Sequence, residues 1–162
     1  MKFRILLCGC GKLGTRYLQG LINFSVISDI YVYDISIDSL HNAQIFINSL
    51  KNKNSHNIIY SEKLNSFPKQ IDLVILSTTA KNRFNLIEEL NSNFTIKNWI
   101  IEKIIAQSFN ELCKIDINLK NCNSAYVNTP RRAWSLYYKL KNKLTPNFQK
   151  KNENYRKFWT CM

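Results

Sequence analysis

The sequence contains little glycine and no long hydrophobic run. Its four glycines all lie between Gly9 and Gly20, so a glycine motif in this stretch does not come from a glycine-rich background. No stretch of about 18 apolar residues occurs, which excludes a membrane-spanning helix. The chain starts directly with an apolar run and shows no signal-peptide pattern. We therefore expect a cytoplasmic protein with no membrane partner.

Cysteine motifs and histidine clusters are also missing. The five cysteines form no paired C-x-x-C motif and have no histidines at metal-ligand spacing. We therefore expect no metal site, and we expect reduced thiols in the core or in loops. One thiol stands at the start of a predicted helix, where a reactive cysteine is the alternative interpretation. The cysteines are Cys8, Cys10, Cys113, Cys122 and Cys161.

Acidic residues are scarce in one segment. The formal net charge is +12, and between Arg131 and Lys157 nine lysines or arginines stand against one acid, Glu153. This segment therefore carries nine minus one, or +8, and the rest of the chain is nearly balanced. Because no nucleic-acid-binding motif accompanies the charge, we expect no specific nucleic-acid partner. Non-specific binding of polyanions stays open.

Short apolar runs alternate with helical patterns along the chain. With 162 residues, 45% of them hydrophobic, the chain fits one domain with a real core. The alternation predicts an α/β fold, a doubly wound and mostly parallel Rossmann sheet in the order 3-2-1-4-5-6 with helices on both faces. The predicted strands are 3–8, 30–34, 58–60, 71–76, 99–103 and 124–128, and the predicted helices are 11–22, 40–50, 83–90, 108–119 and 134–144.

A G-x-G-x-x-G motif, Gly9 to Gly14, joins the first predicted strand to the first helix. Its glycines allow a tight turn, close approach of the backbone to a pyrophosphate, and close helix–strand packing. The free amides at the helix start and the positive end of the helix dipole favour phosphate. The alternative is an ordinary tight turn. The predicted cofactor contacts here are Gly9, Cys10, Gly11, Lys12, Leu13 and Gly14.

An acidic residue and a group of hydroxyl side chains follow two other predicted strands. Asp34 ends the second strand, twenty residues after Gly14, where a carboxylate binds ribose hydroxyls and repels a 2′-phosphate. No arginine follows it directly, so NAD is favoured over NADP. Ser77, Thr78 and Thr79 follow the fourth strand, at the edge where open α/β sheets bind ligands. Helix capping is their alternative role, and the two roles are compatible.

These landmarks together resemble the N-terminal domain of the Gfo/Idh/MocA oxidoreductases, over about residues 1–145. The resemblance includes residues 72–79, the pair Glu102-Lys103 at the fifth strand, and residues 128–132. It implies a nicotinamide dinucleotide and hydride transfer at a carbon of a sugar, nucleotide sugar or cyclitol. The family has Glu-Lys-Pro here, and Ile104 replaces the proline.

The resemblance also assigns roles to residues in the second half of the chain. It implies that Glu102 and Lys103 lie by the cofactor and that Lys103 is catalytic, near nicotinamide and substrate. A solvated lysine at a strand end is the alternative. Arg131 and Arg132 resemble substrate-binding arginines, with an ordinary helix start as their alternative.

The family's second domain, which carries the rest of the substrate site, has no counterpart in this chain. His41 and His56 lie near the second and third strands and are not credible catalytic bases. We therefore expect dinucleotide binding with little or no turnover, and association through apolar surface, including a homo-oligomer. The alternative is a stand-alone NAD-binding or partner-docking module without enzymatic activity.

The lysine-rich end of the chain fits no part of a Rossmann domain. Codons compatible with residues 156–162, shifted by one base, read Gly-Asn-Phe-Gly-Leu-Ala. That phrase resembles a segment that opens the second domain in some family members. We therefore expect a dinucleotide-binding domain over 1–145 and a basic tail over 146–162, left by a frameshift between about Pro146 and Glu153.

Overall fold

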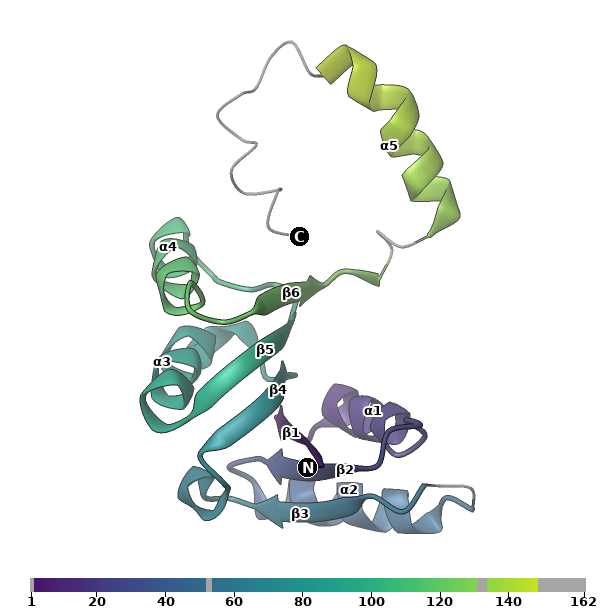
Figure 1. Ribbon diagram of the computed structural model, residues 1–162, viewed down its shortest axis with the longest axis vertical. Helices are drawn as coiled ribbons and strands as arrows, with labels where there is room; N and C mark the ends of the chain where they lie inside the picture. The colour runs from purple at the N-terminus through teal and green to yellow at the C-terminus, as the bar shows by residue number, and fades with distance from the viewer. Residues whose placement is uncertain (1, 52–53, 131–133, 149–162) are drawn as a thin grey trace. The chain divides into compact units, whose positions relative to one another are not determined.

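The computed structural model describes residues 2–51, 54–130 and 134–148. The chain forms two compact units that divide between Val127 and Asn128. Figure 1 shows the elements. The strands are β1 (Phe3–Cys8), β2 (Ser28–Tyr33), β3 (Asn57–Ser61), β4 (Gln70–Leu76), β5 (Thr95–Glu102) and β6 (Ser124–Asn128). The helices are α1 (Lys12–Leu21), α2 (Ile37–Ser49), α3 (Arg83–Asn93), α4 (Phe109–Asn118) and α5 (Ser135–Phe148), with short 3₁₀ turns η1 (Leu64–Ser66) and η2 (Ala80–Asn82).

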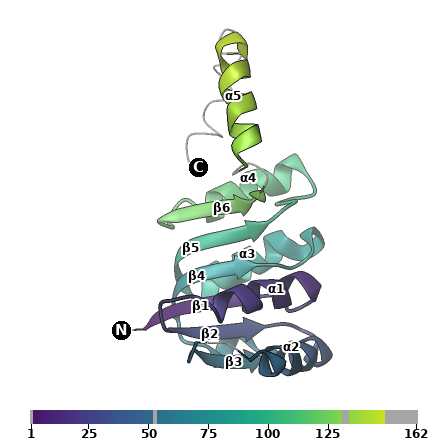
Figure 2. The ribbon, with the colours of Figure 1, turned by 90° about the vertical axis from the view of Figure 1, so that its right-hand side faces the viewer.

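The six strands form one parallel sheet in the order β3-β2-β1-β4-β5-β6, which confirms the predicted fold class and strand order (Figure 2). β1 lies at the centre, where Ile5 pairs with Ile30 of β2 on one side and with Leu73 of β4 on the other. The strand order reverses between β1 and β4. The helices that follow these two strands cover opposite faces of the sheet, and the carboxyl edge at such a reversal is where open α/β sheets bind ligands.

Alternate residues of the central strand point into two separate cores. Leu6 and Cys8 lie in the core that α3 and α4 cover, together with Trp99 of β5. Ile5 and Leu7 lie in the core that α1 and α2 cover. Figure 1 shows the two helix pairs on opposite faces of the sheet. Because both faces of the central strands are buried toward their carboxyl ends, residues 5–8 of β1 and 73–76 of β4 are continuously apolar rather than alternating.

The structure extends several elements beyond their predicted bounds. β5 begins at Thr95, four residues before the prediction, and ends at Glu102, one residue earlier than predicted. Its polar first half pairs with β4, where Asn98 donates a hydrogen bond to the carbonyl of Asp72 and Lys97 forms an ion pair with the Asp72 carboxylate at 2.7 Å. Such cross-strand contacts stabilise polar residues within a strand. A search for apolar runs in the sequence therefore misses this part of β5.

The second unit contains α5, which carries exposed apolar side chains. The rings of Trp134, just before α5, and Tyr137 make an edge-to-face contact with centroids 6.1 Å apart, and Tyr138 is also exposed. The predicted boundary at residue 145 lies inside α5, and residues 149–162 of the predicted tail lie outside the described residues. Among the residues that the structure describes, no helix is long and apolar enough to span a membrane, and no group of side chains is suited to hold a metal ion.

Candidate functional site

The loop after β1 requires a glycine at its first position. Gly9 has φ +92°, a left-handed conformation that other residues rarely adopt. Its N–H donates to the Tyr33 carbonyl at 2.8 Å, which ties the loop to the end of β2. A Cβ atom on Gly9 would lie 2.9 Å from the Thr78 amide nitrogen. The loops after β1, β2 and β4 therefore meet at this residue.

The third glycine of the motif lets α1 pack directly on this loop. A Cβ atom on Gly14 would lie 1.9 Å from the Gly9 carbonyl oxygen, far inside any tolerated contact. Ser77, just after β4, donates its hydroxyl to the same oxygen at 2.7 Å. Gly9 and Gly14 are thus explained by the packing of the protein itself.

The middle glycine has no such explanation. Gly11 has φ −65° and ψ −165°, which suit any residue, and among the described residues nothing lies within 4 Å of a Cβ atom built on it. It is the N-cap of α1, where the described part of the chain supplies no side-chain capping bond, and the first turn carries no acid. The main-chain amides at this helix start are consequently available to an anion from outside the chain.

The carboxylate of Asp34 faces the glycine loop from the end of β2. Its Oδ2 accepts a hydrogen bond from the Cys10 amide at 2.6 Å, and its Oδ1 accepts one from the Ser36 amide at 2.9 Å. A carboxylate has about four acceptor positions, so roughly two remain for the hydroxyls of a ligand. The main chain therefore orients this acid before any ligand arrives.

The thiol between the first two glycines is not a nucleophile. Burial, followed by the neighbouring Asp34 carboxylate, raises the pKa of Cys10 to about 11. The Cys10 side chain lies in the core under α1 and α2, and its carbonyl accepts a hydrogen bond from the Thr15 hydroxyl at 3.1 Å. The alternative of a reactive cysteine at the helix start is therefore wrong, because the thiol is protonated at neutral pH.

The hydroxyl residues after β4 form part of this loop cluster. Ser77 is bonded to the carbonyls of Cys8 and Gly9, at 3.1 and 2.7 Å. Thr79 precedes η2 but makes no side-chain capping bond to described residues. The Thr78 hydroxyl oxygen is buried and has no hydrogen-bond partner within the described ranges. Because this oxygen is closed off from the surface, it is a cost to the packing of the loop and is not exposed to a ligand.

The predicted pair at the end of β5 is split between the interior and the surface. Glu102 is buried and its carboxylate accepts a hydrogen bond from the Tyr17 hydroxyl of α1. Lys103 is exposed and is the first residue past the strand. Sequence reasoning missed Arg83, a fully buried residue that binds the carbonyls of Thr78, Glu102 and Ile104. Nothing in its position at a helix start distinguishes it from a surface arginine.

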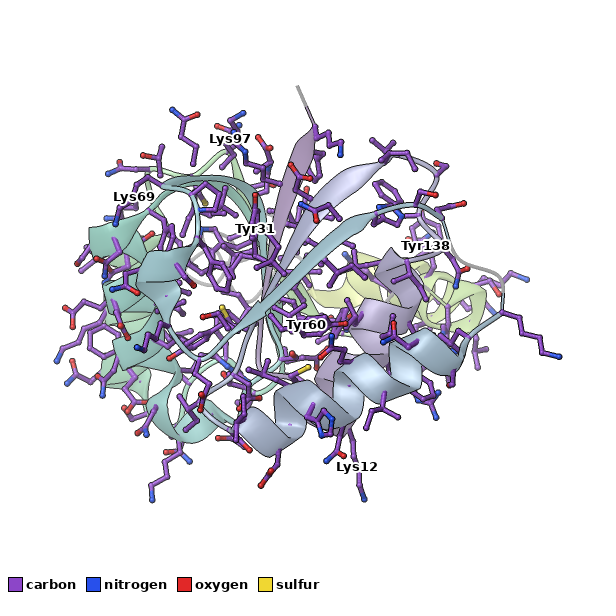
Figure 3. All side chains as sticks on the ribbon, turned by 90° about the horizontal axis from the view of Figure 1, so that it is seen from below. Lys12, Tyr31, Tyr60, Lys69, Lys97 and Tyr138 are labelled. Atoms are coloured by element: carbon purple, nitrogen blue, oxygen red, sulfur yellow. The ribbon has the colours of Figure 1, made fainter. Side chains whose placement is uncertain are left out.

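The sequence also singled out two arginines, two histidines and Lys12. Arg131 and Arg132 lie outside the described residues. His56 accepts a hydrogen bond from the Ser28 amide at 3.1 Å, at the amino end of β2 and away from the glycine loop. Figure 3 shows Lys12, at the start of α1, projecting from the end of the sheet opposite to Lys69 and Lys97. The candidate site is therefore the carboxyl edge, formed by the loops after β1, β2, β4 and β5.

Solved structures resemble this chain in fold. Neither a protein-family model nor a curated protein matches its sequence. Myo-inositol dehydrogenase from Lactobacillus casei, in complex with NAD(H) and myo-inositol, superposes with TM-score 0.70 and 19% identity over 91% of this chain and 42% of its own. The WlbA dehydrogenase from Chromobacterium violaceum, in complex with NADH and UDP-GlcNAcA, gives TM-score 0.70 and 18% identity over 90% and 40%. Myo-inositol 2-dehydrogenase from Lactobacillus plantarum superposes with TM-score 0.66 and 17% identity, over 91% of this chain and 42% of its own.

All three neighbours are dehydrogenases by name, and their likeness to this chain confirms the expected α/β fold. At such low identity the likeness shows a Rossmann-like α/β fold and no more. The chain spans about 42% of the length of the inositol dehydrogenases it matches.

Proposed function

We propose that this chain is the NAD-binding domain of a Gfo/Idh/MocA-type oxidoreductase that acts on a sugar or a nucleotide sugar. The observation that carries the proposal is Gly11, a glycine for which neither the conformation nor the packing of the chain gives a reason. A side chain there would occupy the space through which a diphosphate approaches the α1 amides.

The residues present suit each part of the dinucleotide. The amides from Gly11 to Gly14 bind the diphosphate, since those of Gly9 and Cys10 already donate within the chain, and Asp34 accepts from the hydroxyls of the adenosine ribose. Because Asp34 repels a 2′-phosphate, NAD is preferred to NADP. The other half of the dinucleotide extends along the carboxyl edge toward Ser77, Thr78, Thr79 and the end of β5, near Glu102 and Lys103. When bound, the nicotinamide supplies hydride transfer.

Lys103 is the residue of this chain that we assign to the reaction. Its exposed side chain, one residue past β5, is free to orient a substrate hydroxyl, and Arg131 and Arg132 contribute to substrate binding. We assign the further residues that move the hydroxyl proton to a second domain of the oxidoreductase. The free cysteines of the described residues fit a cytoplasmic setting.

Calorimetric titration of the folded chain with NAD⁺, NADP⁺ and ADP-ribose tests the proposal. NAD⁺ and ADP-ribose are expected to bind, and NADP⁺ is expected to bind at least about tenfold more weakly because its phosphate faces Asp34. Replacement of Asp34 by asparagine should reduce this preference while the diphosphate contacts persist. Absence of NAD⁺ and ADP-ribose binding by a chain with native circular dichroism would refute the proposed function.

A further inference from the structure

One buried cation joins the loop after β4 to the loop after β5. Arg83, the first residue of α3, is 1% exposed. One terminal nitrogen of its guanidinium donates to the carbonyls of Glu102 and Ile104, and the other donates to the carbonyl of Thr78. The planar fork of arginine supplies donors in fixed directions, so a single side chain holds both loops at once.

The residue between the two β5-loop carbonyls is Lys103. Its main chain is therefore held on both sides, while its own side chain stays exposed. A second contact, from the Tyr17 hydroxyl to the Glu102 carboxylate, ties the same strand end to α1. The main chain of Lys103 is thus fixed relative to two other parts of the site. These are the hydroxyl residues after β4 and helix α1, which begins in the glycine loop.

Burying a guanidinium to hold two loops together costs desolvation free energy. Burial lowers the pKa of Arg83, and the Glu102 carboxylate opposes this shift. The Arg83 Nε atom has no hydrogen-bond partner among the described residues, which adds to the cost of its burial. Apolar side chains fill such positions with less desolvation, so geometry rather than stability explains the arginine.

We infer that Arg83 is a positioning residue for the nicotinamide end of the site, where it sets the placement of Lys103 and of the Thr78 loop. This inference rests on the proposed function. Asp34 at the end of β2 receives the adenosine half, so the other half of the dinucleotide lies over β4 and β5. Loss of Arg83 should therefore affect the nicotinamide half of the ligand and spare the ADP-ribose half.

The test compares NADH with ADP-ribose on the full chain and on three variants. Arg83→Gln removes the fork, and Arg83→Lys keeps the charge but provides only one nitrogen. Ile87→Val is the control, because Ile87 is fully buried on the same helix, four residues away, and makes no polar contact. Each protein is titrated calorimetrically, and amide hydrogen exchange of the 103–106 segment is measured alongside thermal unfolding.

We expect the unaltered chain to bind NADH more tightly than ADP-ribose. Arg83→Gln should reduce that ratio by about fivefold or more, because the ligand must then order a loose loop, and should leave ADP-ribose affinity within about twofold. Arg83→Lys should give an intermediate ratio, which keeps the test valid if Arg83→Gln does not fold. Exchange in the 103–106 segment should accelerate in both variants, and Ile87→Val should change neither ratio nor exchange.

Four other results would overturn the inference. Equal losses of NADH and ADP-ribose affinity in the Arg83 variants, or a lower unfolding temperature with an unchanged ratio, would show a purely structural role. If the unaltered chain binds ADP-ribose and NADH equally, the nicotinamide half makes no contact with the loop after β5. The inference would then fail, and the proposed dinucleotide site would stand. An unaltered chain that binds neither ligand would refute the proposed function as well.

Discussion

Replacement of Gly11 by alanine should separate cofactor binding from folding. The residue has φ −65° and ψ −165°, and no described atom lies within 4 Å of a Cβ atom placed on it. Alanine is less favourable than glycine at an N-cap, but it also loses less backbone entropy on folding. The two effects oppose each other, so the free energy of unfolding should change by less than about 1 kcal/mol.

The effect on NAD⁺ affinity should be much larger. A methyl group on Gly11 holds the diphosphate away from the α1 amides and removes one or two hydrogen bonds to a charged group. Such bonds contribute about 1.5–3 kcal/mol each. Since about 1.4 kcal/mol corresponds to a tenfold change, affinity should fall at least about tenfold. Calorimetry with NAD⁺, together with urea unfolding of the same sample, measures both quantities.

Gly20 provides a matched control on the same helix. It also has nothing within 4 Å of a Cβ atom among the described residues, but it lies inside α1, away from the glycine loop. Gly20→Ala should therefore raise the free energy of unfolding by roughly 0.5–1 kcal/mol and leave NAD⁺ affinity unchanged. A Gly11→Ala protein that binds NAD⁺ as tightly as the unaltered chain would refute the assignment of the diphosphate to this helix start.

The other predictions concern packing and titration. Gly14→Ala should lower the free energy of unfolding by about 3 kcal/mol or more, because its Cβ would lie 1.9 Å from the Gly9 carbonyl oxygen; an unchanged urea midpoint would contradict this packing. Cys10, whose pKa burial and Asp34 raise to about 11, should resist iodoacetamide at pH 8 while the half-buried Cys113 reacts, and peptide mapping that finds Cys10 alkylated first would show the reverse. Burial alone would raise the pKa of Asp72, but the hydrogen bond and charge of Lys97 and the Arg4 amide outweigh it and lower the pKa. This contribution is present above the unfolded pKa of about 3.9 and is lost as pH falls through the lower folded value, so Lys97→Met should reduce the fall in unfolding temperature below about pH 4, and an identical pH profile would contradict it.

The fold was predictable because its rules act on sequence patterns that are easy to see. Residues 5–8 of β1 and 73–76 of β4 are continuously apolar because both faces of the sheet are covered there. Parallel strands joined by right-handed crossovers also leave few possible strand orders. The spacing from Gly14 to Asp34 follows from one helix and one strand between two adjacent loops. The polar start of β5 was not predicted from the sequence, because its cross-strand partners, such as Asp72 for Asn98, are distant in sequence.

The site was predictable only as far as main-chain geometry depends on residue type. Glycine is needed at Gly9 for its φ and at Gly14 for its packing, so these two positions of the motif follow from the fold itself. The role of Arg83 depends on three carbonyls at residues 78, 102 and 104, and no local pattern indicates that they converge. The bond from the Cys10 amide to Asp34 was equally hidden, since it joins residues 24 apart.

Because the chain contains few glycines, the NMR signals of their main-chain amides can test the proposed diphosphate site directly. Labelling with ¹⁵N-glycine gives four amide signals, because the chain contains four glycines. On titration with NAD⁺, the Gly11 signal should shift most, with smaller shifts for Gly9 and Gly14, while Gly20 stays in place as an internal control. Saturation with NAD⁺ that leaves the Gly11 signal unmoved would contradict the account.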